Sequence, residues 1–140
     1  MKKAAKGFIT AMAVFFLFLV PLQTASAAPR LKYLSSVYTN AAILDNNRIS
    51  YYGRYTAYDA YTVQLKVALQ KTRTPGVESS WVNAQTTTQT FASKGTQIID
   101  KAYSNLTSGW YYRCQTTATV LINGLPDEIV VVTSRTLYFS

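Results

Sequence analysis

Few residues of this 140-residue chain have side chains suited to catalysis. The sequence contains no histidine, a single cysteine (Cys114) and six carboxylates. Without histidine, neither a Ser-His nor a Cys-His nucleophile pair can form. A zinc site built from several histidine and cysteine ligands is excluded for the same reason. Any catalysis or metal binding would therefore depend on the carboxylates.

The six carboxylates show no spacing typical of a catalytic or metal-binding site. Glycoside hydrolysis needs two carboxylates that face each other across a cleft. Asp127 and Glu128 are neighbours beside a turn, where an extended chain directs their side chains apart and leaves them solvated. Asp45 and Asp59 flank one expected strand, and no calcium-binding loop of the EF-hand type occurs. We therefore expect a protein that is not an enzyme and that holds no metal or cofactor.

A tyrosine-rich segment is the first candidate for binding. The stretch SYYGRYTAYDAY contains five tyrosines and one arginine. By strand alternation, Tyr51 and Tyr55 share one face. Tyr52, Arg54 and Tyr58 share the other. If Tyr51 points inward, this second face presents aromatic rings and a cation suited to stacking on sugar rings or docking a partner. The alternative is that these tyrosines only pair across exposed strands.

Positive charge is the second candidate for binding. The chain has 14 basic and 6 acidic residues, a formal net charge of +8. Lys66, Lys71 and Arg73 gather on one expected strand and its turn, and Arg113 lies on another. Such charge is drawn to anionic polymers outside the cell. The alternative is ordinary solubility charge, with Lys66 also interrupting an apolar strand against edge-to-edge pairing. Nucleic acid is not an expected partner, because no base-reading motif is present.

The N-terminus has the pattern of a bacterial export signal. Three lysines precede an apolar run at 8–20, and an Ala-Ser-Ala site at 25–27 fits the small-x-small rule of signal peptidase. The run is shorter than the roughly 20 residues that a membrane-spanning helix needs. We expect cleavage before Ala28, which removes the signal peptide 1–27 and leaves one soluble, secreted domain, 28–140. The signal takes three of the 14 basic residues and no acidic one, so the processed chain carries a net charge of +5.

The processed chain has the pattern of an all-β domain. It is rich in Thr, Tyr and Val, and period-two alternation recurs between short turn-forming stretches. The alternation predicts seven strands in a single antiparallel β-sandwich of the immunoglobulin or fibronectin type III kind. The Val-rich start of the last strand suggests burial on both of its faces, and Asn123-Gly124 predicts a hairpin before it. The expected ranges are 35–44, 47–57, 61–71, 79–90, 95–104, 110–122 and 128–139.

Cys114 fits the core of such a sandwich. It lies on the sixth expected strand, and Tyr112 two residues earlier occupies the position of a tyrosine corner. The second strand has no cysteine to pair with it, and Ile49, Tyr51 and Gly53 occupy the facing positions. A free cysteine packs as a small hydrophobe, so we expect a buried thiol rather than a nucleophile or an intermolecular disulfide. The expected core residues are Val63, Leu65, Val67, Tyr112, Cys114 and Ala118.

Four segments resemble a known family. NNRISYYGRYTAY, VQLKVALQKT, SSWV and GWYYRCQTTATV, in that order, are similar to the motifs of a family of small exported proteins from Gram-positive bacteria. The resemblance covers nearly the whole processed chain. It implies an immunoglobulin- or fibronectin-like sandwich of unknown function and brings no catalytic residues. At position 114 the family more often has valine, which agrees with a buried thiol.

Two functions remain open. The first is a secreted, non-catalytic binding module that contacts an anionic cell-wall polymer or a surface protein, with Tyr52, Arg54, Tyr58, Lys66 and Arg113 as candidate contacts. The alternative is a secreted effector, such as a toxin or hydrolase inhibitor that acts on competitors. In either case we expect a monomer without a transmembrane segment.

Overall fold

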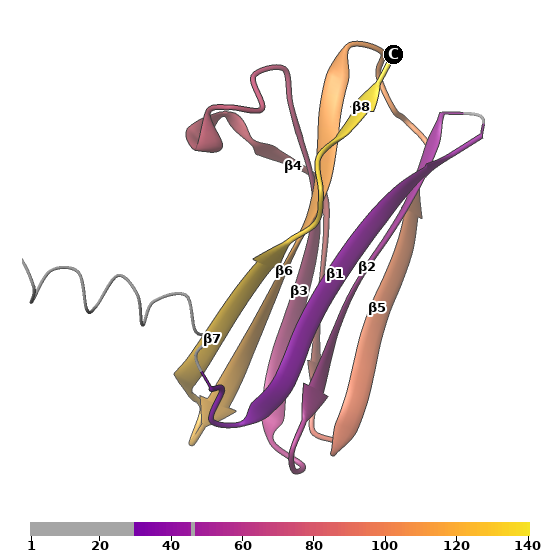
Figure 1. The fold of residues 1–140 in the computed structure, drawn as a ribbon. Coiled ribbons are helices and arrows are strands. Elements are labelled where there is room, and N and C mark those ends of the chain that lie inside the picture. Colours follow the sequence, from indigo (N-terminus) through magenta and orange to yellow (C-terminus); the bar gives the residue numbers. More distant parts are fainter. Residues whose placement is uncertain (1–29, 46) are drawn as a thin grey trace, which may run out of the picture. The chain divides into compact units, whose positions relative to one another are not determined.

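Alternating apolar and polar residues form eight strands in a computed structural model that describes residues 30–45 and 47–140 (Figure 1). The expected signal peptide, 1–27, lies outside the described residues. Within them no helix has the length and apolar character needed to cross a membrane. The strands are β1 (Leu34–Leu44), β2 (Arg48–Ala57), β3 (Thr62–Thr72), β4 (Val82–Phe91), β5 (Gly95–Tyr103), β6 (Trp110–Ile122), β7 (Leu125–Thr133) and β8 (Leu137–Phe139), and the short 3-10 helix η1 (Glu78–Ser80) precedes β4.

The strands form two antiparallel sheets packed as a sandwich within the unit Leu31–Ser140 (Figure 1). Sheet A has the order β1-β2-β5, and sheet B has the order β4-β3-β6-β7, with β8 also paired to β6. The fourth strand pairs with the third, instead of joining the first, second and fifth as in a constant-type immunoglobulin domain. The predicted all-β antiparallel sandwich is confirmed.

The last predicted strand, 128–139, is wrong in its bounds. Asn123 and Gly124 have φ of 52° and 77°, which suits a tight two-residue hairpin turn, so β7 resumes directly at Leu125. The strand then breaks at 134–136, because the Ser134 N–H donates to Cys114 O at 2.8 Å and its Oγ accepts from the Cys114 N–H at 2.9 Å. One serine thus satisfies both backbone groups of Cys114, and β8 pairs further along β6.

Burial of the Val-rich run on both faces was also a wrong expectation. Ile129 and Val131 on β7 are exposed by 60% and 53%, whereas Val130 between them is only partly exposed. β7 is hydrogen-bonded to β6 on one side only, and its outward face lies on the surface of sheet B. An edge position in a sandwich buries one face of a strand and leaves the other in solvent.

The core lies between the two sheets, on the faces that alternation assigns to them. From sheet B it receives Val63, Leu65, Val67, Leu69, Tyr112, Cys114, Ala118 and Val120, all fully buried. From sheet A it receives Ile49, Tyr51 and Tyr55. Between these two tyrosines, a Cβ on Gly53 would lie 2.1 Å from Thr116 Oγ1, so this position admits only glycine. The sheets approach closely at this point.

Tyr112 forms the predicted tyrosine corner. Its side chain is fully buried, and its hydroxyl oxygen accepts a hydrogen bond from the Thr107 N–H, five residues upstream, at 2.8 Å. Next to it, the Leu106 N–H donates to Asn47 O in the turn between β1 and β2. These two bonds give the β5–β6 connection acceptors for its backbone donors. They hold that connection against the end of the sandwich.

Glu128 on β7 binds the segment that leads into β1. Its Oε2 accepts from the Lys32 N–H at 2.5 Å, and its Oε1 accepts from the Tyr33 and Leu34 N–H groups, both at 3.2 Å. The side chain of Lys32 pairs with Asp127 at 3.2 Å. Asp127 is exposed, as expected, but the expectation of a solvated side chain is wrong for Glu128, which is partly buried because it accepts from three backbone donors before the buried Leu34. This contact fastens sheet A to sheet B.

Cys114 is a free, fully buried thiol whose Sγ lies 3.8 Å from Tyr52 O on the opposite sheet. Burial in the core raises the pKa of the thiol. Burial, with a smaller contribution from Cys114, also raises the pKa of Tyr51 to about 12. Both groups are uncharged at neutral pH, as their places in the core require.

Two tyrosine-to-phenylalanine changes should differ in their effect on the free energy of unfolding. Tyr112→Phe leaves the Thr107 N–H without its acceptor and should lower the free energy of unfolding by about 1–3 kcal/mol. Tyr55→Phe removes a buried hydroxyl that has no hydrogen-bond partner among the described residues, so it should be neutral or stabilising. Urea unfolding of the two variants tests this, and equal losses would contradict the tyrosine corner.

Replacement of Cys114 by valine should change the free energy of unfolding by less than about 1.5 kcal/mol, because the swap is nearly isosteric. Cys114→Asp should prevent folding, since it places a charge in the core. The folded protein should react with Ellman's reagent only after addition of denaturant. Rapid labelling of the native protein, or a dimer that reductant separates, would show an outward thiol and a β6 register shifted by one residue.

Candidate functional site

The outward face of sheet A brings together two of the predicted binding residues and one that the prediction missed. Tyr52 and Arg54 point outward from β2, the central strand. The antiparallel register places Tyr38 on β1 directly opposite Arg54. The rings of Tyr38 and Tyr52 have centroids 6.0 Å apart, and the Arg54 guanidinium lies 5.1 Å from the Tyr38 centroid. We call Tyr38, Tyr52 and Arg54 the tyrosine face.

The surroundings of the tyrosine face leave it open to solvent. Tyr38 is 47% exposed, and Ile98, which pairs with Arg54 from β5, is 51% exposed. Asp100, which is also on β5, lies opposite Tyr52 on β2. Arg54 forms no ion pair with a carboxylate of the described residues; its contact is with the Tyr38 ring. The face therefore presents two aromatic rings and a cation without a paired carboxylate.

Tyr58 stands apart from this face. It follows the end of β2, in the turn to β3, and is 50% exposed. Its backbone N–H donates to Tyr33 O at 3.1 Å, at the end where the rings of Tyr33 and Tyr61 meet edge to face. The alternation that grouped Tyr58 with Tyr52 ends with the strand, so the aromatic neighbour of Tyr52 is Tyr38 instead. The sequence could not show this, because only the β1–β2 register brings those two together.

Lys66 lies on the opposite surface of the sandwich. It points outward from β3 in the middle of sheet B, is exposed, and pairs with Thr88 on β4 and Thr117 on β6. Because the two sheets pack face to face, the outward faces of sheets A and B point away from each other. Lys66 and the tyrosine face therefore cannot contact the same small ligand.

Arg113 is engaged within the chain, contrary to its expected place among the free surface charges. Its guanidinium lies 4.1 Å from the Trp81 ring centroid, and its side chain is only 9% exposed. Both terminal nitrogens donate to the carboxylate of Glu78, and Nε donates to Gln70 Oε1 at 2.8 Å. A bidentate pair of this kind is among the stronger polar contacts in proteins. Arg113 thus has a structural role and no free charge.

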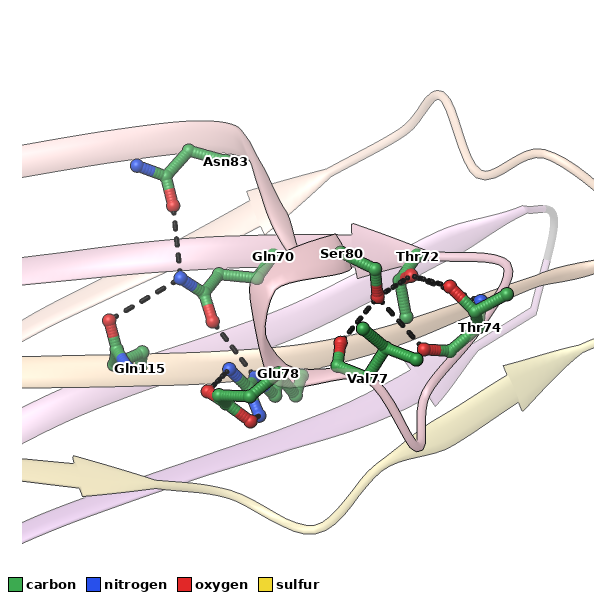
Figure 2. A network of polar contacts seen from close by, with 9 residues as sticks. Gln70, Thr72, Thr74, Val77, Glu78, Ser80, Asn83 and Gln115 are labelled. Atoms are coloured by element: carbon green, nitrogen blue, oxygen red, sulfur yellow. Dashed lines mark hydrogen bonds and ion pairs between the residues drawn. The ribbon is translucent and has the colours of Figure 1, made fainter.

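This arginine belongs to a polar network that folds the β3–β4 connection onto sheet B (Figure 2). Gln70 Nε2 donates to Asn83 and Gln115, on the two strands that flank β3. At the other end of the network, the Ser80 hydroxyl lies 2.7 Å from that of Thr72 and donates to backbone carbonyls of the connection. The network joins residues up to 45 positions apart, so local patterns gave no sign of it.

A second group that the sequence did not reveal lies where β6 begins. The Lys71 ammonium and the Arg73 guanidinium lie 4.9 and 4.8 Å from the centroid of the Trp110 ring. The two basic residues were visible as positive charge on one strand and its turn, but nothing in the sequence placed Trp110 against both of them. No group of three or more potential metal ligands comes together within the part of the chain that the structure describes.

The Arg113–Glu78 pair should make stability depend on pH. The hydrogen bond from Arg113 lowers the pKa of the Glu78 carboxyl in the folded protein below its ordinary value of 4.5. The pair therefore stabilises the fold at neutral pH. This stabilisation is lost as the pH falls from 4.5 through the lowered pKa of the folded protein. Glu78→Gln should therefore unfold at lower urea concentration than the unaltered protein at neutral pH. The difference should shrink in acid.

The matched control is Asp100→Asn, which removes one exposed carboxylate for which the structure shows no ion pair. This variant should unfold with the unaltered protein at both pH values. An equal destabilisation by both substitutions would indicate an effect of net charge alone, and the assigned role of Glu78 would be wrong.

Comparison with models of known protein families gives no match, and comparison with curated proteins gives none either. The function must therefore be inferred from the chain's own residues and their arrangement.

Proposed function

We propose that this chain is a small exported, non-catalytic binding module whose tyrosine face contacts a polymer of the cell wall. Export is inferred from the signal pattern of residues 1–27. The observation that carries the binding role is the tyrosine face itself: two tyrosines and an unpaired arginine, in mutual contact, on the open surface of the central strand of sheet A and its neighbour.

The geometry of this face suits a sugar polymer. Tyrosine offers a wide, rigid ring at low entropic cost, because only two side-chain torsions must be fixed. The rings of Tyr38 and Tyr52 are inclined by 36° to each other, so together they offer apolar surface to more than one sugar ring. Arg54, held by the Tyr38 ring, adds donors for hydroxyl or carboxylate groups. A sheet surface favours an extended polymer over a small molecule, since small ligands occupy concave sites.

A non-catalytic role agrees with how the carboxylates are used. The sequence has no histidine, and four of its six carboxylates make contacts within the chain: Glu78 with Arg113, Asp127 with Lys32, Glu128 with the backbone before β1, and Asp59 with the Ala60 N–H. Of the two others, Asp100 lies beside the tyrosine face, where it can accept hydrogen bonds from sugar hydroxyls. Carboxylates engaged within the chain are not available for catalysis, and the position of Asp100 supports a binding role for the tyrosine face.

Cosedimentation with washed cell walls tests the proposal. The secreted protein should pellet with walls of the producing bacterium, and the double variant Tyr38→Ser/Tyr52→Ser should bind about tenfold more weakly or worse, a factor that corresponds to about 1.4 kcal/mol. The matched control is Tyr138→Ser, on β8 in sheet B, where the tyrosine is exposed by 54%. It should bind like the unaltered protein.

Three outcomes would contradict this proposal. Failure of the unaltered protein to bind walls would exclude a wall-binding module and favour an effector that acts at a distance. Equal binding by the tyrosine double variant would show that this face is not the contact surface. Loss of binding after protease treatment of the walls would identify a surface protein, and not a polymer, as the partner. Circular dichroism of each variant confirms that the sandwich is intact.

A further inference from the structure

The cluster around Trp110 combines aromatic surface with two positive charges at the end of sheet B. Lys71 is the penultimate residue of β3, Arg73 follows in the connection to β4, and Trp110 opens β6 beside the C-terminal strand β8 (Figure 1). Arg73 is exposed, and the other two are partly exposed. Both cationic groups lie within contact distance of one ring, at 4.9 and 4.8 Å from its centroid.

The two positive charges of this cluster have no carboxylate partner among the residues that the structure describes. Within the described residues, the ion pairs are Lys32–Asp127 and Arg113–Glu78, so neither Lys71 nor Arg73 is paired with a carboxylate. Holding two like charges near each other is unfavourable unless an anion lies close to both. Neighbouring cations without a carboxylate are therefore suited to an anion from outside the chain.

Comparison of the two tryptophans of the chain strengthens this argument. Trp81 also has a cation against its ring, Arg113 at 4.1 Å, but that charge is neutralised by Glu78 and the side chain is nearly buried. This is the arrangement of a cation that only supports the fold. Trp110 has two cations in place of one, with no carboxylate and with access to solvent. The cation at Trp81 is thus neutralised by a carboxylate of the described residues, whereas the two cations at Trp110 are not.

We propose that Trp110, Lys71 and Arg73 form a site for the phosphate groups of an anionic polymer. The planar guanidinium matches a phosphate group with two parallel donors, and the ammonium adds a compact charge. Contact with the ring restrains both side chains before the ligand arrives, which lowers the entropy lost on binding. A polymer that repeats its phosphate groups gains apparent affinity, because a neighbouring phosphate can rebind at the same site. A free phosphate ion lacks this gain.

This inference takes from the proposed function only the setting outside the cell, and its residues are separate from the tyrosine face. Lys71 and Trp110 belong to strands of sheet B, whereas Tyr38, Tyr52 and Arg54 belong to sheet A. The phosphate site names the chemical class of one ligand group, and the tyrosine face would contact the sugar rings of a different polymer. Either site can therefore fail without the other.

Titration calorimetry with purified teichoic acid, a polymer of phosphodiesters, tests the site. The double variant Lys71→Gln/Arg73→Gln should bind at least about tenfold more weakly, and its slope of log affinity against log salt should fall by about two, one for each lost phosphate contact. The matched control, Lys94→Gln/Lys101→Gln, removes two exposed lysines and the same net charge. Its affinity should change less than about twofold, since those lysines lie elsewhere on the surface.

Further titrations separate the alternatives. Inorganic phosphate should bind far more weakly than the polymer, and polyglutamate should bind more weakly than teichoic acid at equal charge. Equal losses in the two double variants would show non-specific attraction to net charge and would overturn the site. Preference for polyglutamate would overturn the assignment to phosphate. The tyrosine-face variant Tyr38→Ser/Tyr52→Ser should keep its affinity for teichoic acid, so a failure of the proposed function is distinguishable from a failure of this site.

Discussion

The close approach of the two sheets at Gly53 is the constraint on which the rest of the structure depends. A side chain at this position would collide with Thr116 on β6 and Val67 on β3, so β2 packs against sheet B in the register that places a glycine here. That register buries Tyr51 and Tyr55 on either side of the glycine. Because side chains alternate along a strand, it also fixes Tyr52 and Arg54 on the surface. The proposed binding face is thus a consequence of core packing.

Polar contacts then hold segments that the apolar core does not reach. Tyr112 holds the β5–β6 connection, Glu128 holds the chain before β1, and Arg113 with Glu78 holds the β3–β4 connection. Tyr112 and Glu128, both from sheet B, accept hydrogen bonds from backbone N–H groups of these segments, whereas Arg113 donates to the exposed carboxylate of Glu78. These contacts also use two of the carboxylates, Glu78 and Glu128, which are therefore not free for other roles.

The two surfaces proposed for binding differ in chemistry as well as in place. The tyrosine face is mainly aromatic and hydroxyl-bearing, with one arginine, whereas the Trp110 cluster is dominated by charge. Salt should therefore weaken contacts at the second surface much more than at the first. A cell wall contains both sugar polymers and phosphate polymers, so a module with two such surfaces can contact both kinds. This combination is a reason to regard the chain as a binding module.

The sequence by itself determined the all-β sandwich, the bounds of six strands to within three residues, and the inward face of Cys114. It could do so because period-two alternation is a local property that burial enforces. It also indicated that Tyr52 and Arg54 lie opposite the buried Tyr51. The tertiary structure alone decided which residues from other strands meet them. Tyr38 joins Tyr52 through the β1–β2 register, Trp110 joins Lys71 through the β3–β6 pair, and Glu78 reaches Arg113 across 35 residues. Contacts between distant segments depend on register and sheet order, and no local pattern encodes these.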